Sequence, residues 1–349
     1  MELTLENKIE LEELIRTNHI SKIKHPFYDL FLLSYTKKTS AEAKWVDTTL
    51  NARGLIIDSN FNIISRPFKK FFEIFQLSKE VVIPYNLNTT IYEKLDGSLV
   101  ISYWVNDSFF LTTKGKFDSF QSIIANKIFK NKYTEILPFL NKKYTYIFEL
   151  ISPFTTNIID YGNIEDLYLL EIIDTFTNES IEIESVIIFK KPKKYNILLS
   201  DAINDNDKSP EEGYVVKFEN DFRLKIKKRR FKLSYHKNQA LKREILNSIY
   251  NSKQIENFYK NKSENELLMF KKLYKKAVDL IEFIDFYLNS DTLKTEKLEI
   301  IEYFKLKYEN NNKLNFFILE RLFTTSQYFS LKVPYNNSFL RIAHKSLHF

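Results

Sequence analysis

The stretch from residue 92 to residue 100 reads Tyr92-Glu93-Lys94-Leu95-Asp96-Gly97-Ser98-Leu99-Val100. Its apolar flanks predict two strands, and the Asp-Gly pair between them predicts a tight turn. In that arrangement Lys94 stands at the end of the first strand, and Gly97 permits a turn that leaves the lysine amine at the mouth of a cavity. A plain hairpin without chemistry is the alternative, because Lys-x-Asp-Gly occurs by chance in many proteins.

A second group of lysines accompanies the predicted strand 222–226. Lys225 and Lys227 are two residues apart, so a strand points both amines to one face, while Leu224 and Ile226 turn toward a core. Two ammonium groups on one face suit a triphosphate. They would also lower the pKa of a nearby third lysine by charge repulsion, which is one way for a lysine to become a nucleophile. A solvated basic face is the alternative.

Two acidic residues also stand at or beside predicted strands. Glu149 lies inside the apolar run Tyr-Ile-Phe-Glu-Leu-Ile, and Glu212 precedes Gly213-Tyr-Val-Val-Lys-Phe. Carboxylates at strand positions that face a site are hard ligands for Mg²⁺, or can hydrogen-bond a ribose. A single acidic residue on a strand more commonly lies on the solvent-exposed face.

Cations and aromatic rings lie beside further short strands, in the segments 51–58 and 66–72 and at Lys114-Gly115. The five glycines, Gly54, Gly97, Gly115, Gly162 and Gly213, are never closer than 18 residues. A glycine-rich phosphate loop is therefore excluded, and with it the Walker, dinucleotide and kinase loops. If the protein binds a nucleotide, side chains must hold the phosphates.

Composition narrows the class of protein. The chain has 349 residues, of which 44% are hydrophobic and 28% charged, which is typical of a globular protein of about two domains. The absence of cysteine excludes disulfides, iron–sulfur clusters and thiolate zinc sites. No apolar run reaches the roughly 18–20 residues of a membrane helix, and the start lacks the features of a signal peptide. We expect a cytoplasmic protein without a membrane partner.

The predicted secondary structure changes along the chain. A helix is predicted over residues 6–17 and another over 119–129. Short strands are predicted from about residue 27, among them 99–105, 109–113, 181–183 and 214–218, and a polar loop over 201–211. Beyond about residue 238, apolar residues recur at helical spacing, and Ser263 with Glu266 forms a capping-box pattern. We therefore predict an α+β domain over residues 1–238, followed by an all-helical domain over residues 239–349.

The motifs gain specificity when they are taken in order. They read Ala-Arg-Gly, Arg-Pro-x-x-Lys-Phe-Phe, Lys-x-Asp-Gly-Ser, Thr-Lys-Gly, Phe-Glu-Leu, Glu-Gly-Tyr-Val and Lys-Ile-Lys, over roughly residues 25–237. This set resembles the covalent nucleotidyltransferase superfamily of ATP-dependent ligases and capping enzymes. Within it, the Lys-Phe-Phe block and the serine after Lys-x-Asp-Gly resemble RNA ligase family 1, the T-even-phage type of single-strand RNA ligase.

The resemblance implies a fold, a reaction and roles. The fold is a nucleotidyltransferase domain with antiparallel sheets. Lys94 would attack the α-phosphorus of ATP to form lysyl-AMP, and Lys225 and Lys227 would contact phosphates. Glu149 and Glu212 would serve the ribose and a Mg²⁺ or Mn²⁺ site. Positions matching those that the family uses around the nucleotide and the RNA 5′-phosphate are Arg53, Lys70, Phe72 and Lys114. Glu93, Gly97 and Gly213 are also expected at the cofactor site, the two glycines as backbone requirements.

The implied partners are single-stranded or nicked RNA ends, with broken tRNA as one example, handled by a monomer in a bacterial or phage-infected cell. The helical domain would help to select the RNA. The chain departs from the family at Phe231, where a tyrosine is common four residues after the second lysine of the last motif. A role for a phenol hydroxyl there is therefore in doubt.

Rival readings remain open. A DNA ligase or an mRNA capping enzyme usually appends an OB-fold, which needs strands and turn residues that the last 110 or so residues lack. A catalytically silent RNA-binding protein is a second rival, which the intact lysines and acids argue against. The third is a basic α+β scaffold in which the motifs occur by chance.

Overall fold

The computed structural model describes residues 5–77, 82–153, 155, 158–182, 188–205, 211–229, 231–233 and 267. The chain divides into two compact units, residues 1–232 and 233–349. All elements named below belong to the first unit. The helical domain predicted over residues 239–349 lies outside the described residues apart from Leu267, so that domain stays a prediction.

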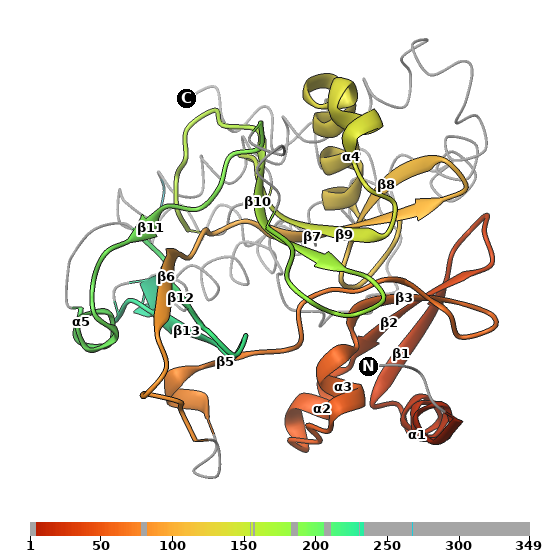
Figure 1. The fold of residues 1–349 in the computed structure, drawn as a ribbon, viewed down its shortest axis with the longest axis horizontal. Coiled ribbons are helices and arrows are strands. Elements are labelled where there is room, and N and C mark those ends of the chain that lie inside the picture. The colour runs from red at the N-terminus through yellow and green to blue at the C-terminus, as the bar shows by residue number, and fades with distance from the viewer. Residues whose placement is uncertain are drawn as a thin grey trace. The chain divides into compact units, whose positions relative to one another are not determined.

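The first sheet is antiparallel with the order β1-β2-β3-β4. Helix α1 lies against it (Figure 1) because Leu11 and Leu14 are buried with the apolar residues that its strands point toward the helix. Two short helices fill the connection between β2 and β3. The elements are α1 (Leu5–Arg16), β1 (Ile20–Lys24), β2 (Leu30–Tyr35), α2 (Lys37–Ala41), α3 (Asp47–Asn51), β3 (Arg53–Asp58) and β4 (Ile63–Ser65).

The second sheet is antiparallel with the order β10-β9-β7-β8. Helix α4 begins where the Ser119 side chain accepts a hydrogen bond from the Ser122 amide, a typical N-cap, and it packs on this sheet. The elements are β7 (Ser98–Val105), β8 (Ser108–Thr113), α4 (Phe120–Lys132), the 3₁₀ helix η2 (Thr134–Phe139), β9 (Tyr144–Ile151) and β10 (Asp166–Asp174).

The third sheet has the order β11-β6-β12-β13-β5 and is antiparallel except for the parallel pair β13–β5. Alternate residues of its central strands, among them Ile91, Val216 and Leu224, form a buried cluster with helix α5. The elements are β5 (Phe72–Glu73), the 3₁₀ helix η1 (Ile74–Gln76), β6 (Thr89–Glu93), β11 (Lys194–Tyr195), α5 (Leu199–Asn204), β12 (Gly213–Phe218) and β13 (Arg223–Lys227).

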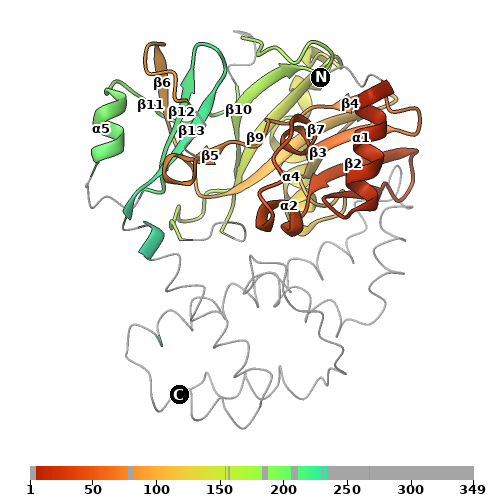
Figure 2. The same cartoon turned by 90° about the horizontal axis from the view of Figure 1, so that it is seen from below.

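The arrangement of the sheets positions the site. The second sheet lies between the first and the third in Figure 2. Since α5 and its cluster occupy one face of the third sheet, the other face of β6, β12 and β13 is left to meet β10. The predicted antiparallel-sheet architecture is confirmed. Within the described part of the chain, no helix is both long enough and apolar enough to cross a membrane.

Two local predictions are wrong. The polar loop predicted over residues 201–211 contains most of α5, because Leu199, Ala202 and Ile203 lie three and four residues apart and pack on the third sheet. The strand predicted over residues 181–183 is not formed at Ile181 and Glu182, although the Ile181 amide donates to the Ile172 carbonyl.

Candidate active site

Lys94 directly follows strand β6 and is anchored through its backbone. Its amide donates to the Gly213 carbonyl at 2.9 Å, which continues the pairing of β6 with β12. Its side chain is 20% exposed, and Nζ lies 2.9 Å from Glu212 Oε2. The lysine predicted to be the nucleophile therefore stands at a strand end, with its amine held in an ion pair.

The turn after Lys94 is fixed on both sides. Asp96 is buried, and its Oδ2 accepts the amides of Ile158 and Ile159 at 2.6 and 2.9 Å. Gly97 donates to Glu149 Oε1 at 3.1 Å, and a Cβ at position 97 would lie 2.3 Å from the Leu150 carbonyl oxygen. Glycine is required there because β9 approaches closely.

Glu212 is the acidic centre of the site. It is only 4% exposed, and its two oxygens are divided between two lysines, Oε2 with Lys94 and Oε1 with Lys227 at 2.8 Å. The next residue, Gly213, has a φ of +142°, and a Cβ on it would lie 2.0 Å from the Ile226 carbonyl oxygen. Glycine is therefore needed at the start of β12 to bring Glu212 between the two lysines.

Strand β13 presents the predicted phosphate-binding pair. Leu224 and Ile226 are buried, whereas Lys225 and Lys227 alternate with them on the other face, as predicted. Lys225 makes no ion pair with a described residue, and its Nζ lies 5.4 Å from the centre of the Phe71 ring. Burial, followed by the positive charges of Lys70, Arg53, Lys94 and Lys227, lowers the pKa of Lys225 to about 6.

Lys225 and Lys227 were expected to lower the pKa of a third lysine nearby, and Lys94 is a lysine in that position. Burial lowers the pKa of Lys94, but the negative charges of Glu212, Glu149 and Asp96 outweigh burial and raise it. Charge repulsion among the cations acts instead on Lys225, which makes no ion pair with a described residue. The sequence pattern indicated that neighbouring cations would lower the pKa of one lysine. It did not show which lysines form ion pairs with Glu212.

Glu149 lies on β9 beside the turn. Burial is the largest influence on it, and together with the charge of Glu212 it raises the pKa of Glu149 to about 7, against the lowering effect of Lys94. Its Oε1 accepts the Gly97 amide. Among the described residues, no group of three or more His, Cys, Asp or Glu side chains is suited to hold a metal ion.

A second cluster, here called the cation–aromatic cluster, holds Arg53, Lys70, Phe72 and Lys114, all of them predicted, together with Tyr35 and Trp45. Lys70 Nζ lies 4.5 Å from the centre of the Phe72 ring, and Lys114 Nζ lies 5.3 Å from that of Tyr35. Phe72 pairs in register with Leu224, which places this cluster beside β13.

The cation–aromatic cluster is poised for an anion. Arg53 Nη1 is buried and has no hydrogen-bond partner among the described residues. Burial would raise the pKa of Tyr35, but the charges of Lys114, Arg53 and Lys70 outweigh it and lower that pKa. Since an unpaired buried donor beside several cations is costly, the geometry fits phosphate oxygens.

Sequence reasoning missed Tyr35 and Trp45. Tyr35 ends β2, which pairs with β3 through Ser34 and Arg53. Trp45 packs between Tyr35 and Phe72, with ring centres 5.2 and 5.1 Å away. The sequence could have identified Tyr35 if a strand had been predicted to end beside Arg53. No spacing in the sequence links Trp45 to the site.

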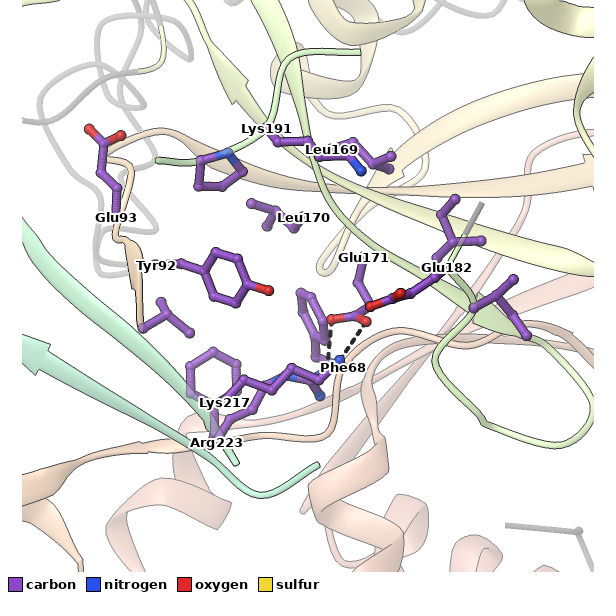
Figure 3. Close-up of a pocket in the computed structure, with 15 residues that line it drawn as sticks. Phe68, Tyr92, Glu93, Leu169, Leu170, Glu171, Glu182, Lys191, Lys217 and Arg223 are labelled. Carbon is purple, nitrogen blue, oxygen red and sulfur yellow. Dashed lines mark hydrogen bonds and ion pairs between the residues drawn. The ribbon is translucent and has the colours of Figure 1, made fainter. Parts of the chain in front are cut away.

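A cavity of about 360 Å³ opens between the third sheet and β10 (Figure 3). Its wall starts at Glu93, the residue before Lys94, and continues along Tyr92 and Val215 to Leu170 on β10. Charged groups close another part of the wall, where Glu171 pairs with Lys217 and Arg223 at 2.8 Å each. Glu93, which was predicted to bind the cofactor, thus lines this cavity.

Phe231 is buried, and its ring centre lies 5.1 Å from Lys227 Nζ. The aromatic ring is thus kept beside the last lysine without the hydroxyl that the family pattern usually supplies. Lys94, Lys225, Lys227, Glu149 and Glu212 converge around the end of β6, and the cation–aromatic cluster adjoins them. The combination pairs an amine nucleophile with many cations for a polyphosphate.

Comparisons with known proteins agree with the motifs. The model of a family described as RNA ligase matches residues 51–231. A protein of Autographa californica nuclear polyhedrosis virus, described as a bifunctional polynucleotide kinase/RNA ligase, is 24% identical over 61% of this chain and 34% of its own length. An RNA ligase of Rhodothermus phage RM378 is 28% identical over 32% of this chain and 34% of its own. The chain thus spans about a third of these relatives.

Solved structures of ligases are similar at lower identity. A Naegleria gruberi RNA ligase with pyrophosphate is 18% identical, covers 42% of this chain and 50% of its own, and has a TM-score of 0.34. An archaeal ATP-dependent RNA ligase is 13% identical over 78% of both chains, with a TM-score of 0.42.

Proposed function

The chain belongs to the RNA ligase family, and we propose that it is an ATP-dependent RNA ligase that joins 5′-phosphate and 3′-hydroxyl RNA ends. The observation that carries the proposal is Lys94, held 2.9 Å from buried Glu212 and surrounded by cations that face the same side. An amine in that setting is suited to attack a phosphorus atom whose charge the neighbouring cations neutralise.

The first step forms a covalent adenylate. Lys94 Nζ loses a proton along its hydrogen bond to Glu212 and attacks the α-phosphorus of ATP, and as the N–P bond forms, the bond to pyrophosphate breaks. AMP then passes to the 5′-phosphate of RNA, which frees Lys94. A 3′-hydroxyl attacks this RNA-adenylate, AMP leaves, and a phosphodiester results.

The cations of the site have separate places in this reaction. Lys225 and Lys227 share the face of β13 beside Lys94, so they suit the phosphate under attack. The cation–aromatic cluster adjoins β13 at Phe72 and suits the departing pyrophosphate or the RNA 5′-phosphate. Charge neutralisation and positioning, rather than covalent chemistry, are what these residues supply.

A divalent metal fits the site with part of its ligands supplied by the nucleotide. Glu149 keeps one carboxylate oxygen clear of the Gly97 amide, whereas both oxygens of Glu212 are engaged with lysines. Mg²⁺ or Mn²⁺ would be held by Glu149, with Glu212 nearby, and would neutralise phosphate charge. We therefore assign the metal first to Glu149.

The cavity beside Glu93 suits the base of the nucleotide. It is lined by apolar side chains such as Val215 and Leu170, and it starts one residue from Lys94. A purine placed there leaves its α-phosphate on the side of Lys94. This orientation also gives the ribose to Glu149 or Glu212.

The natural substrate we propose is a broken RNA, with tRNA as the example, repaired by a monomer in the cytoplasm of a bacterial or phage-infected cell. The relative from the polyhedrosis virus supports a repair role, because its description combines a ligase with a polynucleotide kinase, the type of enzyme that supplies 5′-phosphates. Selection of the RNA is assigned to the second unit.

The test is ligation with defined ends. The full chain, ATP and Mg²⁺ are incubated with a single-stranded RNA that carries a labelled 5′-phosphate and a 3′-hydroxyl, beside a DNA of the same sequence and an RNA with a 3′-phosphate. Circular or joined RNA only in the first reaction supports the proposal. Joined DNA would indicate a DNA ligase, transfer from GTP a capping enzyme, and RNA binding without any AMP transfer a silent RNA-binding protein.

A further inference from the structure

Among the described residues that line the cavity beside Glu93, Tyr92 is the uncharged polar side chain, and the reaction does not use it. Tyr92 lies on β6, in register with Val215 of β12, and is half-buried. Figure 3 shows its ring inside the cavity, below Leu170, with the hydroxyl directed inward. The residue is placed there by alternation, because Ile91 on one side of it turns into the core beneath the sheet.

The hydroxyl of Tyr92 makes no hydrogen bond with any residue that the structure describes. Three of the charged side chains that line the cavity, Glu171, Lys217 and Arg223, are paired with one another, and Glu182 and Lys191 also line it. Glu171 receives Lys217 and Arg223 at 2.8 Å each, and Arg223 also pairs with Asp221 at 2.8 Å. Tyr92 therefore brings a neutral hydrogen-bond donor and acceptor into a cavity that is lined by both apolar and charged side chains.

We propose that Tyr92 is a specificity-determining residue, whose hydroxyl hydrogen-bonds the edge of the purine base in this cavity. The inference rests on the proposed function, since it takes the nucleotide attacked by Lys94 as the occupant. A purine fits because Leu170 and Val215 offer apolar surfaces and Glu93 places the cavity next to the nucleophile. The exocyclic 6-amino group of adenine is the partner of the phenol oxygen.

A hydrogen bond between Tyr92 and the 6-amino group would affect which nucleotide binds more tightly. A site that hydrogen-bonds a ligand group discriminates against an analogue without that group, because its own polar atom is then left unpaired. Tyr92 should therefore favour ATP over purine riboside triphosphate, which is the same nucleotide without the 6-amino group. One neutral hydrogen bond corresponds to roughly a fivefold preference.

The experiment compares the two nucleotides on the full chain. The rate of AMP or purine-nucleotide transfer to the protein is measured in single turnovers at increasing nucleotide concentration, for wild type and Tyr92→Phe. We expect Tyr92→Phe to weaken apparent ATP binding about fivefold, to leave binding of purine riboside triphosphate unchanged, and to keep the rate at saturation near that of wild type. Phenylalanine keeps the ring and removes only the hydroxyl.

Tyr144→Phe is the matched control. Tyr144 on β9 is also half-buried, its hydroxyl makes no hydrogen bond with a described residue, and it does not line the cavity. This variant should keep the wild-type preference. An unchanged preference in Tyr92→Phe, or an equal loss for both nucleotides, would overturn the role of Tyr92. Failure of the wild-type chain to take up AMP from ATP would instead contradict the proposed function itself.

Discussion

Lys94 and Lys225 show how two lysines of one site come to have different charges. Both are largely enclosed, but Lys94 has Glu212 at 2.9 Å, whereas Lys225 makes no ion pair with a described residue and lies 5.4 Å from the centre of the Phe71 ring. The pKa of Lys94 is therefore raised, whereas that of Lys225 is lowered to about 6. In the free protein at neutral pH, the nucleophile is charged and its neighbour on β13 is neutral.

The neutral Lys225 leads to a prediction about protons. A bound triphosphate raises the pKa of Lys225, so binding at pH 8 should take up close to one proton, since the group is deprotonated before binding and protonated after it. Metal-free calorimetry in buffers of different ionisation enthalpy measures this uptake. The triphosphate also raises the pKa of Glu149, which is about 7 in the free protein, so a variant is needed to assign the proton.

Lys225→Met is the variant that assigns the proton. It should bind the nucleotide more weakly and remove most of the uptake. An uptake of the same size in this variant would show that another group binds the proton.

Glu212 should control the charge of Lys94. Glu212→Gln removes the negative charge that raises the pKa of Lys94, so that pKa should fall, and Lys94 should react faster with an amine-directed reagent at pH 8. Peptide mass spectrometry measures the modification of Lys94. Lys193, an exposed residue directly before β11, is the internal reference. A rate for Lys94 that does not change relative to Lys193 would exclude this control.

At the scale of the elements, close approach between strands holds the site. Gly213 starts β12 with a φ of +142° and no room for a Cβ beside Ile226. Gly213→Ala should therefore destabilise the protein by about 2 kcal/mol or more, through backbone strain and separation of β12 from β13. Urea unfolding measures the difference.

Gly115→Ala is the control for that variant. A Cβ at Gly115 meets nothing within 4 Å, and its φ is outside the left-handed region. Its free energy of unfolding should stay within about 0.5 kcal/mol of wild type. Equal losses of stability in both variants would mean that the close contact between Gly213 and Ile226 adds no strain of its own.

The elements also show what a sequence can predict. Strands such as β7, β8 and β12 were predicted within one or two residues because apolar runs bounded by turn residues mark them. The two-residue strands β5 and β11 have no periodicity of their own and exist through pairing with β13 and β6. Helix α5 was predicted as loop because its apolar face is short and is fixed by packing on the third sheet.

The sequence likewise predicted some residues of the site and missed others. Motif order identified the residues around Lys94, because each motif sits at a strand end or on a strand face that the fold brings together. It missed Tyr35 and Trp45, which lie outside the motifs and reach the site through tertiary packing. It also did not show which lysine has the lowered pKa, since charge pairing depends on distances that sequence spacing does not contain.

At the scale of the whole molecule, the first compact unit ends at residue 232 and holds every residue assigned to AMP transfer. A chain that ends at residue 238 should therefore still label itself with AMP from ATP, at a rate within about tenfold of the full chain. Circular dichroism checks that the fragment is folded. A folded fragment that takes up no AMP would show that the second unit is needed for the first step.

The most direct test of the central claim is the location of the adenylate. The full chain is incubated with Mg²⁺ and α-labelled ATP, and labelled peptides are identified by mass spectrometry, with Lys94→Ala in parallel. The account predicts AMP bound through nitrogen at Lys94, release of the label when RNA with a 5′-phosphate is added, and no label in Lys94→Ala. AMP on another residue, or a fully labelled Lys94→Ala variant, would contradict it.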